Sequence, residues 1–219
     1  MRIAIAGGHG TVAMETTRLL TQRGIEVASV IRKASQAGDI EAVGGQPIVA
    51  DLESLDGAEL TEAIGTVDAV LFAAGAGPGS GAERKQTVDH DGAVKFIEVA
   101  RRGGAGHYVM LGSMGADPDH EGDDVFDVYL RAKGAADRDL RASGVGYTIV
   151  RPTRLTDDDP VGVVELSADA SGDAISRADV AAVLAEVLVL DEPTNETLQL
   201  TAGTTPVDQA VEVIATGSR

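Results

Sequence analysis

Two residues, Tyr129 and Lys133, have side chains and a spacing suited to proton transfer. They lie four positions apart in segment 126–143, whose apolar residues recur with helical periodicity. Positions i and i+4 of a helix project from one face. A free tyrosine, with a pKa of about 10, is a poor acid at neutral pH, and a neighbouring ammonium favours its phenolate. The pair predicts a general acid with its tuning cation; the alternative is a packed tyrosine and a lysine extending to solvent.

A glycine-rich segment, GGHGTVA at 7–13, has the pattern of a dinucleotide-binding loop. Its residues match G-x-G-x-x-G/A from Gly8, and a second frame, Gly7-x-x-Gly10-x-x-Ala13, has the spacing that one large enzyme group uses. Glycines allow a tight turn and close approach of N–H groups to a pyrophosphate, which the start of the next helix also attracts. The alternative is an ordinary glycine turn. We expect cofactor contacts at Gly7, Gly8, His9, Gly10, Thr11 and Val12, with His9 contributing its backbone.

The residues after the second apolar run indicate which dinucleotide binds. An NAD-preferring site carries Asp or Glu about 20 residues after the glycines. Here the chain reads VIRKAS at 30–35, with Arg32 and Lys33 in that place. Because a guanidinium can pair bidentately with a 2′-phosphate, these residues favour NADP (NADPH) as cofactor. The alternative is that both cations belong to a solvated loop.

Short apolar runs alternate with longer segments of helical periodicity. The runs are apolar throughout, which indicates strands buried on both faces. The repeated order predicts an α/β fold, a Rossmann-type doubly wound parallel sheet with helices on both faces. We expect strands at 2–6, 26–31, 46–50, 67–74, 107–111 and 147–150, and helices near 11–23, 34–43, 54–64, 83–102 and 126–143.

The pattern becomes less regular after Val150. A polar run at 153–160 precedes a strand at 161–166, a helix at 177–190, a strand at 197–200 and a helix from Pro206. No internal repeat or linker interrupts the chain, and 219 residues suffice for one full core. We therefore expect one NAD(P)-binding domain over 1–219, with a small C-terminal substrate region.

Composition excludes several classes of function. The chain has 18 Lys and Arg against 35 Asp and Glu, a net charge of −17 that should repel nucleic acid and anionic membranes. It contains no cysteine, so disulfides, thiolate metal sites and cysteine nucleophiles are absent. The histidines and acidic runs lack metal-ligand spacing. With neither a signal peptide nor an apolar run of about 18 residues, we expect a cytoplasmic protein.

The chain resembles the atypical short-chain dehydrogenase/reductase superfamily, in its compact NAD(P)-binding branch described as sugar-epimerase-like or NmrA-like. The match covers nearly the whole chain and is more specific than the glycine loop alone. Its carriers are GGHGTVA at 7–13, Arg32, ADL at 50–52, LFAAGAG at 71–77, VDHDGAVKFIEVARRGG at 88–104, YVMLGSMGADP at 108–118, YLRAKGAADRDLRASGVGYTIVRPTRLT at 129–156 and ISRADVAAVLAEVL at 175–188.

The resemblance implies further cofactor contacts. Asp51 and Leu52 would lie against the adenine; the alternative for Asp51 is a cap of the following helix, and one residue could fill both roles. The wall beside the middle of the cofactor would be formed by Ala73, Ala74 and Gly75.

The resemblance also implies a catalytic trio of Ser113, Tyr129 and Lys133. Ser113 would position a carbonyl, and Lys133 would hydrogen-bond the nicotinamide ribose as well as tune the phenol. Two residues depart from the family pattern, since Gly112 and Thr153 stand where serine and glycine are common. Either change could alter the substrate loop.

The sequence predicts an NADP-dependent oxidoreductase acting on a small carbonyl or quinone-like compound. Its substrate should lie near 114–128 and 152–176, beyond the strand ends, where the acidic sequence disfavours a highly anionic substrate. The large substrate domain of longer sugar-nucleotide epimerases is missing, which argues against epimerase activity. Two alternatives remain: a non-catalytic NADP(H)-sensing regulator and a reductase that dispenses with Tyr129. We expect a monomer or homodimer.

Overall fold

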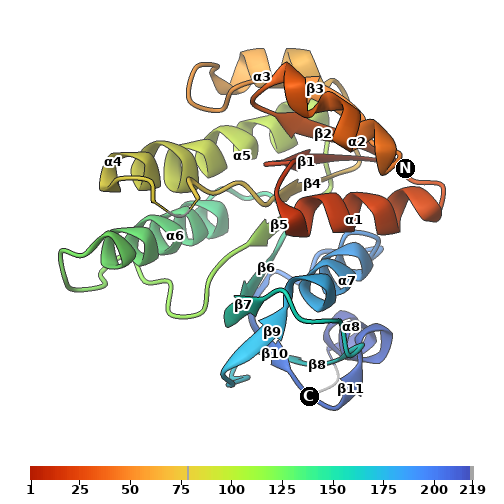
Figure 1. Ribbon diagram of the computed structural model, residues 1–219, viewed down its shortest axis with the longest axis vertical. Coiled ribbons are helices and arrows are strands. Elements are labelled where there is room, and N and C mark those ends of the chain that lie inside the picture. Colours follow the sequence, from red (N-terminus) through yellow and green to blue (C-terminus); the bar gives the residue numbers. More distant parts are fainter. Residues whose placement is uncertain (78, 218–219) are drawn as a thin grey trace.

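The apolar runs of the sequence form the strands of one central sheet. The computed structural model describes residues 1–77 and 79–217. Within these residues the sheet has nine strands in the order β11-β8-β10-β6-β5-β4-β1-β2-β3 (Figure 1). Their bounds are β1 (Arg2–Ala6), β2 (Glu26–Ile31), β3 (Gln46–Val49), β4 (Ala69–Phe72), β5 (His107–Leu111), β6 (Tyr147–Pro152), β8 (Val163–Ser167), β10 (Glu196–Ala202) and β11 (Thr205–Pro206).

Seven neighbouring strands, from β3 to β10, run parallel, and β8 and β11 add an antiparallel edge. The chain reverses its direction of travel across the sheet between β1 and β4, so their carboxyl ends border a topological switch point where ligands bind in such folds. The predicted doubly wound Rossmann-type fold is therefore confirmed, and the antiparallel edge is an addition to it.

Helices cover both faces of the sheet (Figure 1). Along β1, alternate side chains enter different cores, with Ile3 and Ile5 on one face and Ala4 and Ala6 on the other. The first core is closed by α1 (Thr11–Gln22), α7 (Arg177–Val187) and α8 (Val207–Thr216). The second is closed by α3 (Gly57–Ile64), α5 (Gly92–Gly103) and α6 (Val125–Ala142). Two helical layers therefore hold the switch point in place.

The expected helix over 83–102 is interrupted. It begins as α4 (Ala82–Arg84), widens into a π-helix, η2 (Lys85–Asp91), and continues as α5. The wider turn places Lys85 and Asp89 against the loop that follows β4, where Lys85 Nζ donates to the Gly77 carbonyl at 3.1 Å and Asp89 Oδ2 accepts from the Ala76 N–H at 3.1 Å. A π-turn inside a helix is frequent at functional sites.

Two further regions differ from the expected elements. The helix expected near 34–43 is a short 3-10 turn, η1 (Ala34–Gln36), followed by α2 (Ala37–Ala42). Beyond β6, in a region expected to be a polar run, β7 (Arg154–Thr156) pairs in parallel with β9 (Ala174–Ser176) as a separate small sheet. This pairing joins segments about 20 residues apart, which local periodicity does not reveal.

His107, the first residue of β5, is buried at the amino end of this central strand. Its Nε2 lies 2.9 Å from Thr148 Oγ1, and its Nδ1 has no partner among the described residues. Burial lowers the pKa of His107 from 6.5 to about 4, because the charged imidazolium would lose its hydration.

This shift makes stability depend on pH. In the unfolded chain His107 binds a proton below about pH 6.5, whereas in the folded chain it stays neutral down to about pH 4. The free energy of unfolding should therefore decrease as the pH is lowered from 6.5 to 4. The full shift corresponds to about 3 kcal/mol. We expect His107→Asn to flatten this part of the profile in urea unfolding at pH 7.0, 5.5 and 4.5. An unchanged slope in the variant would contradict the buried, neutral imidazole.

Candidate functional site

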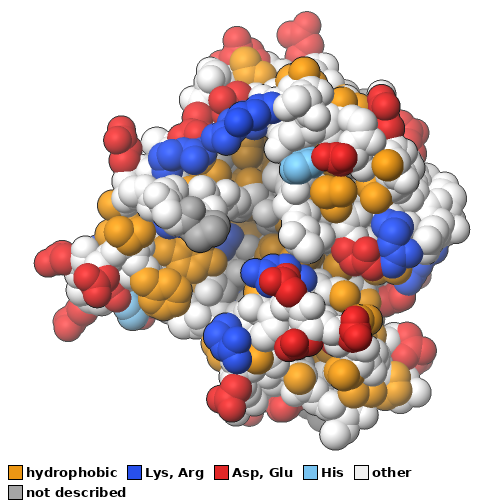
Figure 2. All heavy atoms as spheres, viewed as in Figure 1, with side chains coloured by type: hydrophobic (Ala, Val, Ile, Leu, Met, Phe, Trp, Pro, Cys, Tyr) orange, Lys and Arg blue, Asp and Glu red, His pale blue; other side chains and the backbone are white. Residues whose placement is uncertain are grey.

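An open cleft lies at the carboxyl ends of the parallel strands, at the switch point. It is bordered by the glycine loop after β1, the end of β2, the segments after β3 and β4, and residues of α4 and η2. Figure 2 shows this hollow with Lys and Arg side chains along one rim, while acidic side chains are scattered around the rest of the face. In a chain with a net charge of −17, this local gathering of cations favours an anionic ligand.

The glycine loop is pressed against the neighbouring strands. Gly7 has a φ of +73°, and a Cβ atom there would lie 2.5 Å from Ala74 Cα. A Cβ on Gly8 would lie 2.7 Å from Ser29 Cβ, and the Gly8 N–H donates to the Val30 carbonyl at 2.9 Å. Only glycine fits both positions, because a side chain would push the loop away from the strands.

The loop leads directly into α1, whose N-cap is Gly10. No side chain caps this helix, so the first-turn N–H groups, including those of Thr11 and Val12, face no competing side-chain acceptor. Thr11 is exposed and Val12 is buried under the loop. An uncapped helix start of this kind binds phosphate oxygens well, so the loop fits the pyrophosphate of a dinucleotide.

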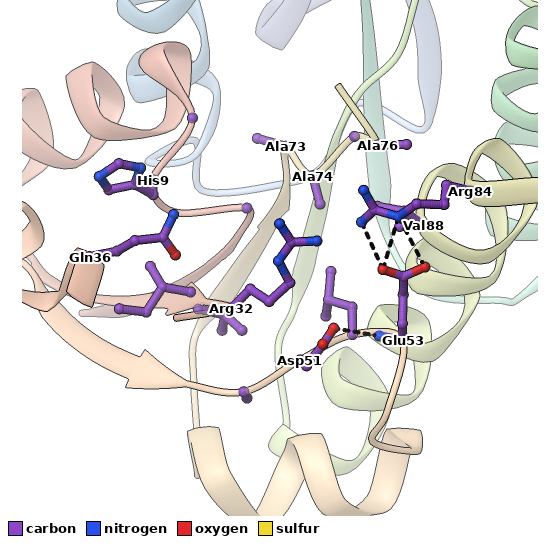
Figure 3. A pocket seen from close by; sticks show the side chains of 17 residues that line it. His9, Arg32, Gln36, Asp51, Glu53, Ala73, Ala74, Ala76, Arg84 and Val88 are labelled. Carbon is purple, nitrogen blue, oxygen red and sulfur yellow. Dashed lines mark hydrogen bonds and ion pairs between the residues drawn. The ribbon is translucent and has the colours of Figure 1, made fainter. Parts of the chain in front are cut away.

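Arg32 extends from the end of β2 into the cleft (Figure 3). Its side chain is exposed, and no hydrogen bond to its guanidinium is found within residues 1–77 and 79–217. Lys33 is also exposed but does not line the cleft. His9 lines the cleft, and its Nε2 lies 2.7 Å from Asp39 Oδ2, so this imidazole already has a protein partner.

The segment after β3 contributes Asp51 and Leu52 to the cleft. Asp51 Oδ1 accepts the Glu53 N–H at 3.0 Å and closes the turn, whereas Asp56 is the residue that caps α3. The alternative prediction that Asp51 caps that helix is therefore wrong. Leu52 is buried and supplies an apolar surface beside the cleft.

The segment after β4 forms the opposite wall, with Ala73, Ala74 and Gly75 all lining the cleft. Asp89 supports this wall from behind through its bond to Ala76. Asp89 is only 1% exposed, and its burial raises the pKa of the carboxyl while Lys133 and Lys85 favour the charged form. Sequence reasoning missed Asp89, because it is followed by the polar residues His90 and Asp91 and only the π-turn of η2 buries it.

The three residues expected to be catalytic lie on two neighbouring elements. Tyr129 and Lys133 are on α6, and Ser113 follows β5, where its Oγ donates to the Met114 carbonyl at 3.3 Å. The Tyr129 ring stacks on Phe126, with centroids 5.8 Å apart, and Lys85 Nζ lies 5.4 Å from its centroid. Among the described residues, no hydrogen bond joins the three expected groups to one another. Sequence reasoning missed Lys85.

Lys133 is buried rather than extended to solvent, so the alternative prediction for this lysine is wrong. It is 3% exposed, and its Nζ donates to the Leu111 carbonyl at 2.6 Å. Its positive charge acts to lower the pKa of the Asp89 and Asp137 carboxyls, against the effect of their burial. Asp137 Oδ2 accepts in turn from Arg151 Nε at 2.8 Å. Burial raises the pKa of Asp137, and Arg151 and then Lys133 oppose that rise.

The expected substrate segments lie beyond β5 and β6. Thr153 Oγ1 donates to the Gly172 carbonyl at 2.9 Å and so joins the two ends of 152–176. Glycine rather than serine is accommodated at position 112, because a Cβ there would lie only 2.9 Å from Arg151 Cγ. The described residues contain no cluster of metal ligands, and none of their helices is both long and apolar enough to span a bilayer.

A doubly wound sheet with a glycine loop and a cleft at the switch point is typical of dinucleotide-binding proteins. The chain belongs to the NAD(P)H-binding family, whose model matches residues 7–191. Within it, the chain lies in the atypical short-chain dehydrogenase/reductase branch that sequence analysis indicated.

Three similar proteins illustrate this membership. The uncharacterized sugar epimerase YhfK of Bacillus subtilis is 31% identical, over 97% of this chain and 99% of its own length. A solved structure described as an NAD-dependent epimerase/dehydratase of Bacillus halodurans is 35% identical, with a TM-score of 0.88, over 97% of this chain and 99% of its own. The NAD(P)H azoreductase of Xenophilus azovorans is 28% identical, over 68% of this chain and 47% of its own.

Proposed function

We propose that the protein is an NADPH-dependent reductase of small carbonyl or quinone-like compounds. The observation that carries this proposal is the position of Arg32, an exposed guanidinium that enters the cleft without a hydrogen-bond partner among the described residues. A 2′-phosphate would give it that partner, and an acid at this place would repel the phosphate. The pyrophosphate would lie on the glycine loop and the start of α1. Gly8 would let the loop lie close to β2, and the buried side chain of Val12 would support the helix start.

The residues after β5 and on α6 would complete the site at the nicotinamide end. A bound NADPH would supply the hydride to the carbonyl carbon. Ser113 and Tyr129 would each donate a hydrogen bond to the carbonyl oxygen, and Tyr129 would transfer its proton to that oxygen as charge develops. Since Tyr129 is partly exposed, the phenolate could regain its proton from solvent.

Lys133 would orient the site from below. An ammonium has three donor protons, and the Leu111 carbonyl takes one of them. The other two are free to hold the nicotinamide ribose and to face the phenol, while the bond to Leu111 fixes the strand end that leads to Ser113. Through its bond to Ala76, Asp89 would hold the wall after β4 in a fixed position relative to the Lys133 ammonium.

The choice of a conjugated substrate is supported by similarity and by charge. The similar azoreductase is named for reduction of an azo compound, a conjugated electron acceptor. The substrate-side loop 114–128 carries several acids and few bases, so a neutral or cationic acceptor suits it better than a polyanion.

One observation favours a second candidate, a reductase that uses the nicotinamide alone. The buried Lys133 donates to the Leu111 carbonyl, and within the described residues no hydrogen bond joins it to the Tyr129 hydroxyl. In such an enzyme Tyr129 would only pack against the substrate.

The cofactor assignment predicts the behaviour of an Arg32→Ala variant. Removing a bidentate guanidinium–phosphate contact should weaken NADPH binding by about 10- to 100-fold and leave NADH binding unchanged. Calorimetric titration measures both affinities, with Arg101→Ala, an exposed arginine on α5, as the control. Equal affinity of the native protein for NADPH and NADH would contradict the assignment, and loss of both ligands in the variant would point to structural damage.

The role of Tyr129 is tested by Tyr129→Phe, which keeps the ring and removes the proton. We expect unchanged NADPH affinity and a turnover reduced by roughly 100-fold, the scale for loss of a general acid. Tyr147→Phe is the control, because Tyr147 is partly buried at the opposite, amino end of β6. Steady-state NADPH oxidation with a panel of carbonyls and quinones gives the rates. A Tyr129→Phe enzyme with the native rate would favour the nicotinamide-only reductase.

A further inference from the structure

One side of the cleft carries an ion pair, Arg84 with Glu53, that the dinucleotide motif does not include. We propose that Arg84 and Glu53 form a clasp over the adenosine end of the bound dinucleotide, with the Arg84 guanidinium as one face of a slot for the adenine ring. This inference rests on the dinucleotide-binding part of the proposed function and is independent of the redox step.

The ion pair joins two segments that are far apart in sequence. Glu53 follows β3 and Arg84 ends α4, and the two side chains lie next to each other along one side of the cleft (Figure 3). Arg84 Nη2 donates to Glu53 Oε2 at 2.7 Å, and Arg84 Nε lies 3.2 Å from the same oxygen and 3.3 Å from Oε1. Thr87 adds a third anchor, since its Oγ1 donates to Glu53 Oε1 at 2.7 Å. Bonds from two guanidinium nitrogens fix the plane of the group, not only its position.

The space beside Arg84 suits a flat aromatic ring. Leu52 and Val88 both line the cleft and are only 8% and 6% exposed, so they offer an apolar surface at its base. A guanidinium plane stacks well on aromatic faces and is weakly hydrated, which makes it a suitable cover for adenine. Without a ligand, an exposed ion pair of this kind contributes little to stability. A role in folding therefore does not explain why the pair lies at the cleft, whereas a role in ligand binding does.

The clasp also corrects an electrostatic conflict. Glu53 is close enough to Arg32 for that guanidinium to help hold the pKa of the Glu53 carboxyl below its usual range, after the larger effects of Arg84 and Thr87. A free carboxylate so near Arg32 would repel a phosphate bound there. Arg84 neutralises Glu53 and removes this repulsion. Arg84 should therefore support binding of adenosine in general and of a 2′-phosphate in particular.

Binding of cofactor fragments tests the clasp without any turnover. The ligands are 5′-AMP, 2′,5′-ADP and nicotinamide mononucleotide, titrated by ligand-observed NMR against the native protein and Arg84→Met, which keeps the chain length and loses the planar charge. We expect 5′-AMP to bind about tenfold more weakly to Arg84→Met, 2′,5′-ADP to lose more than that, and the mononucleotide to be unaffected.

Two controls sharpen the result. Arg102→Met removes an arginine that is also paired with a glutamate, Glu98, but on the outer surface of α5, and it should bind all three ligands like the native protein. Because Glu53 acts on adenosine through Arg84, the double variant Glu53→Gln, Arg84→Met should bind 5′-AMP no more weakly than Arg84→Met alone.

The outcomes separate the clasp from the proposed function. Native affinity of Arg84→Met for 5′-AMP overturns the clasp, as does an equal loss for all three ligands or a native protein that binds no 5′-AMP. A native protein that binds the fragments in the expected pattern but reduces no carbonyl or quinone supports the clasp while the proposed reaction fails.

Discussion

The close approach of Gly7 to Ala74 is the constraint on which the site depends. The backbone turn after β1 rests against the backbone after β4, where a Cβ on Gly7 would lie 2.5 Å from Ala74 Cα. This contact brings the start of α1 to the switch point and sets the width of the cleft there. Because no side chain separates the two turns, the helix start, the wall after β4 and the cation at the end of β2 border the same cleft.

Buried charges extend this arrangement from the cofactor cleft toward the expected substrate side. Asp89 holds the wall after β4, Lys133 holds the end of β5, and Asp137 is bound by Arg151 from β6. Ions buried to this degree persist in a fold only when each has a partner, so the series fixes three strand ends relative to η2 and α6. The wall of the cleft after β4 and the ends of β5 and β6 are therefore linked through buried charged residues.

Local sequence patterns predicted the elements that local physics determines. The apolar runs predicted the strands, and the glycine loop and Arg32 indicated the cleft. Both predictions were possible because strand burial and turn geometry depend on residues that are close in sequence. The missed features are long-range. Glu53 and Arg84 lie 31 positions apart. Asp89 faces the loop after β4 only because η2 is a π-helix, whose turn is wider than the α-helical period that the sequence predicts. The β7–β9 pair likewise joins two three-residue strands about 20 positions apart, each too short to show a periodic pattern.

Hydrogen exchange measured with and without NADPH tests most directly the claim that a dinucleotide crosses the switch point. We expect slower exchange of backbone amides in 7–13, 32–36 and 73–76, three of the segments that border the cleft. Amides at the amino ends of the strands, such as those near Tyr147, should be unaffected. Saturating NADPH that leaves these three segments unprotected, or protects only segments remote from the cleft, would contradict the account.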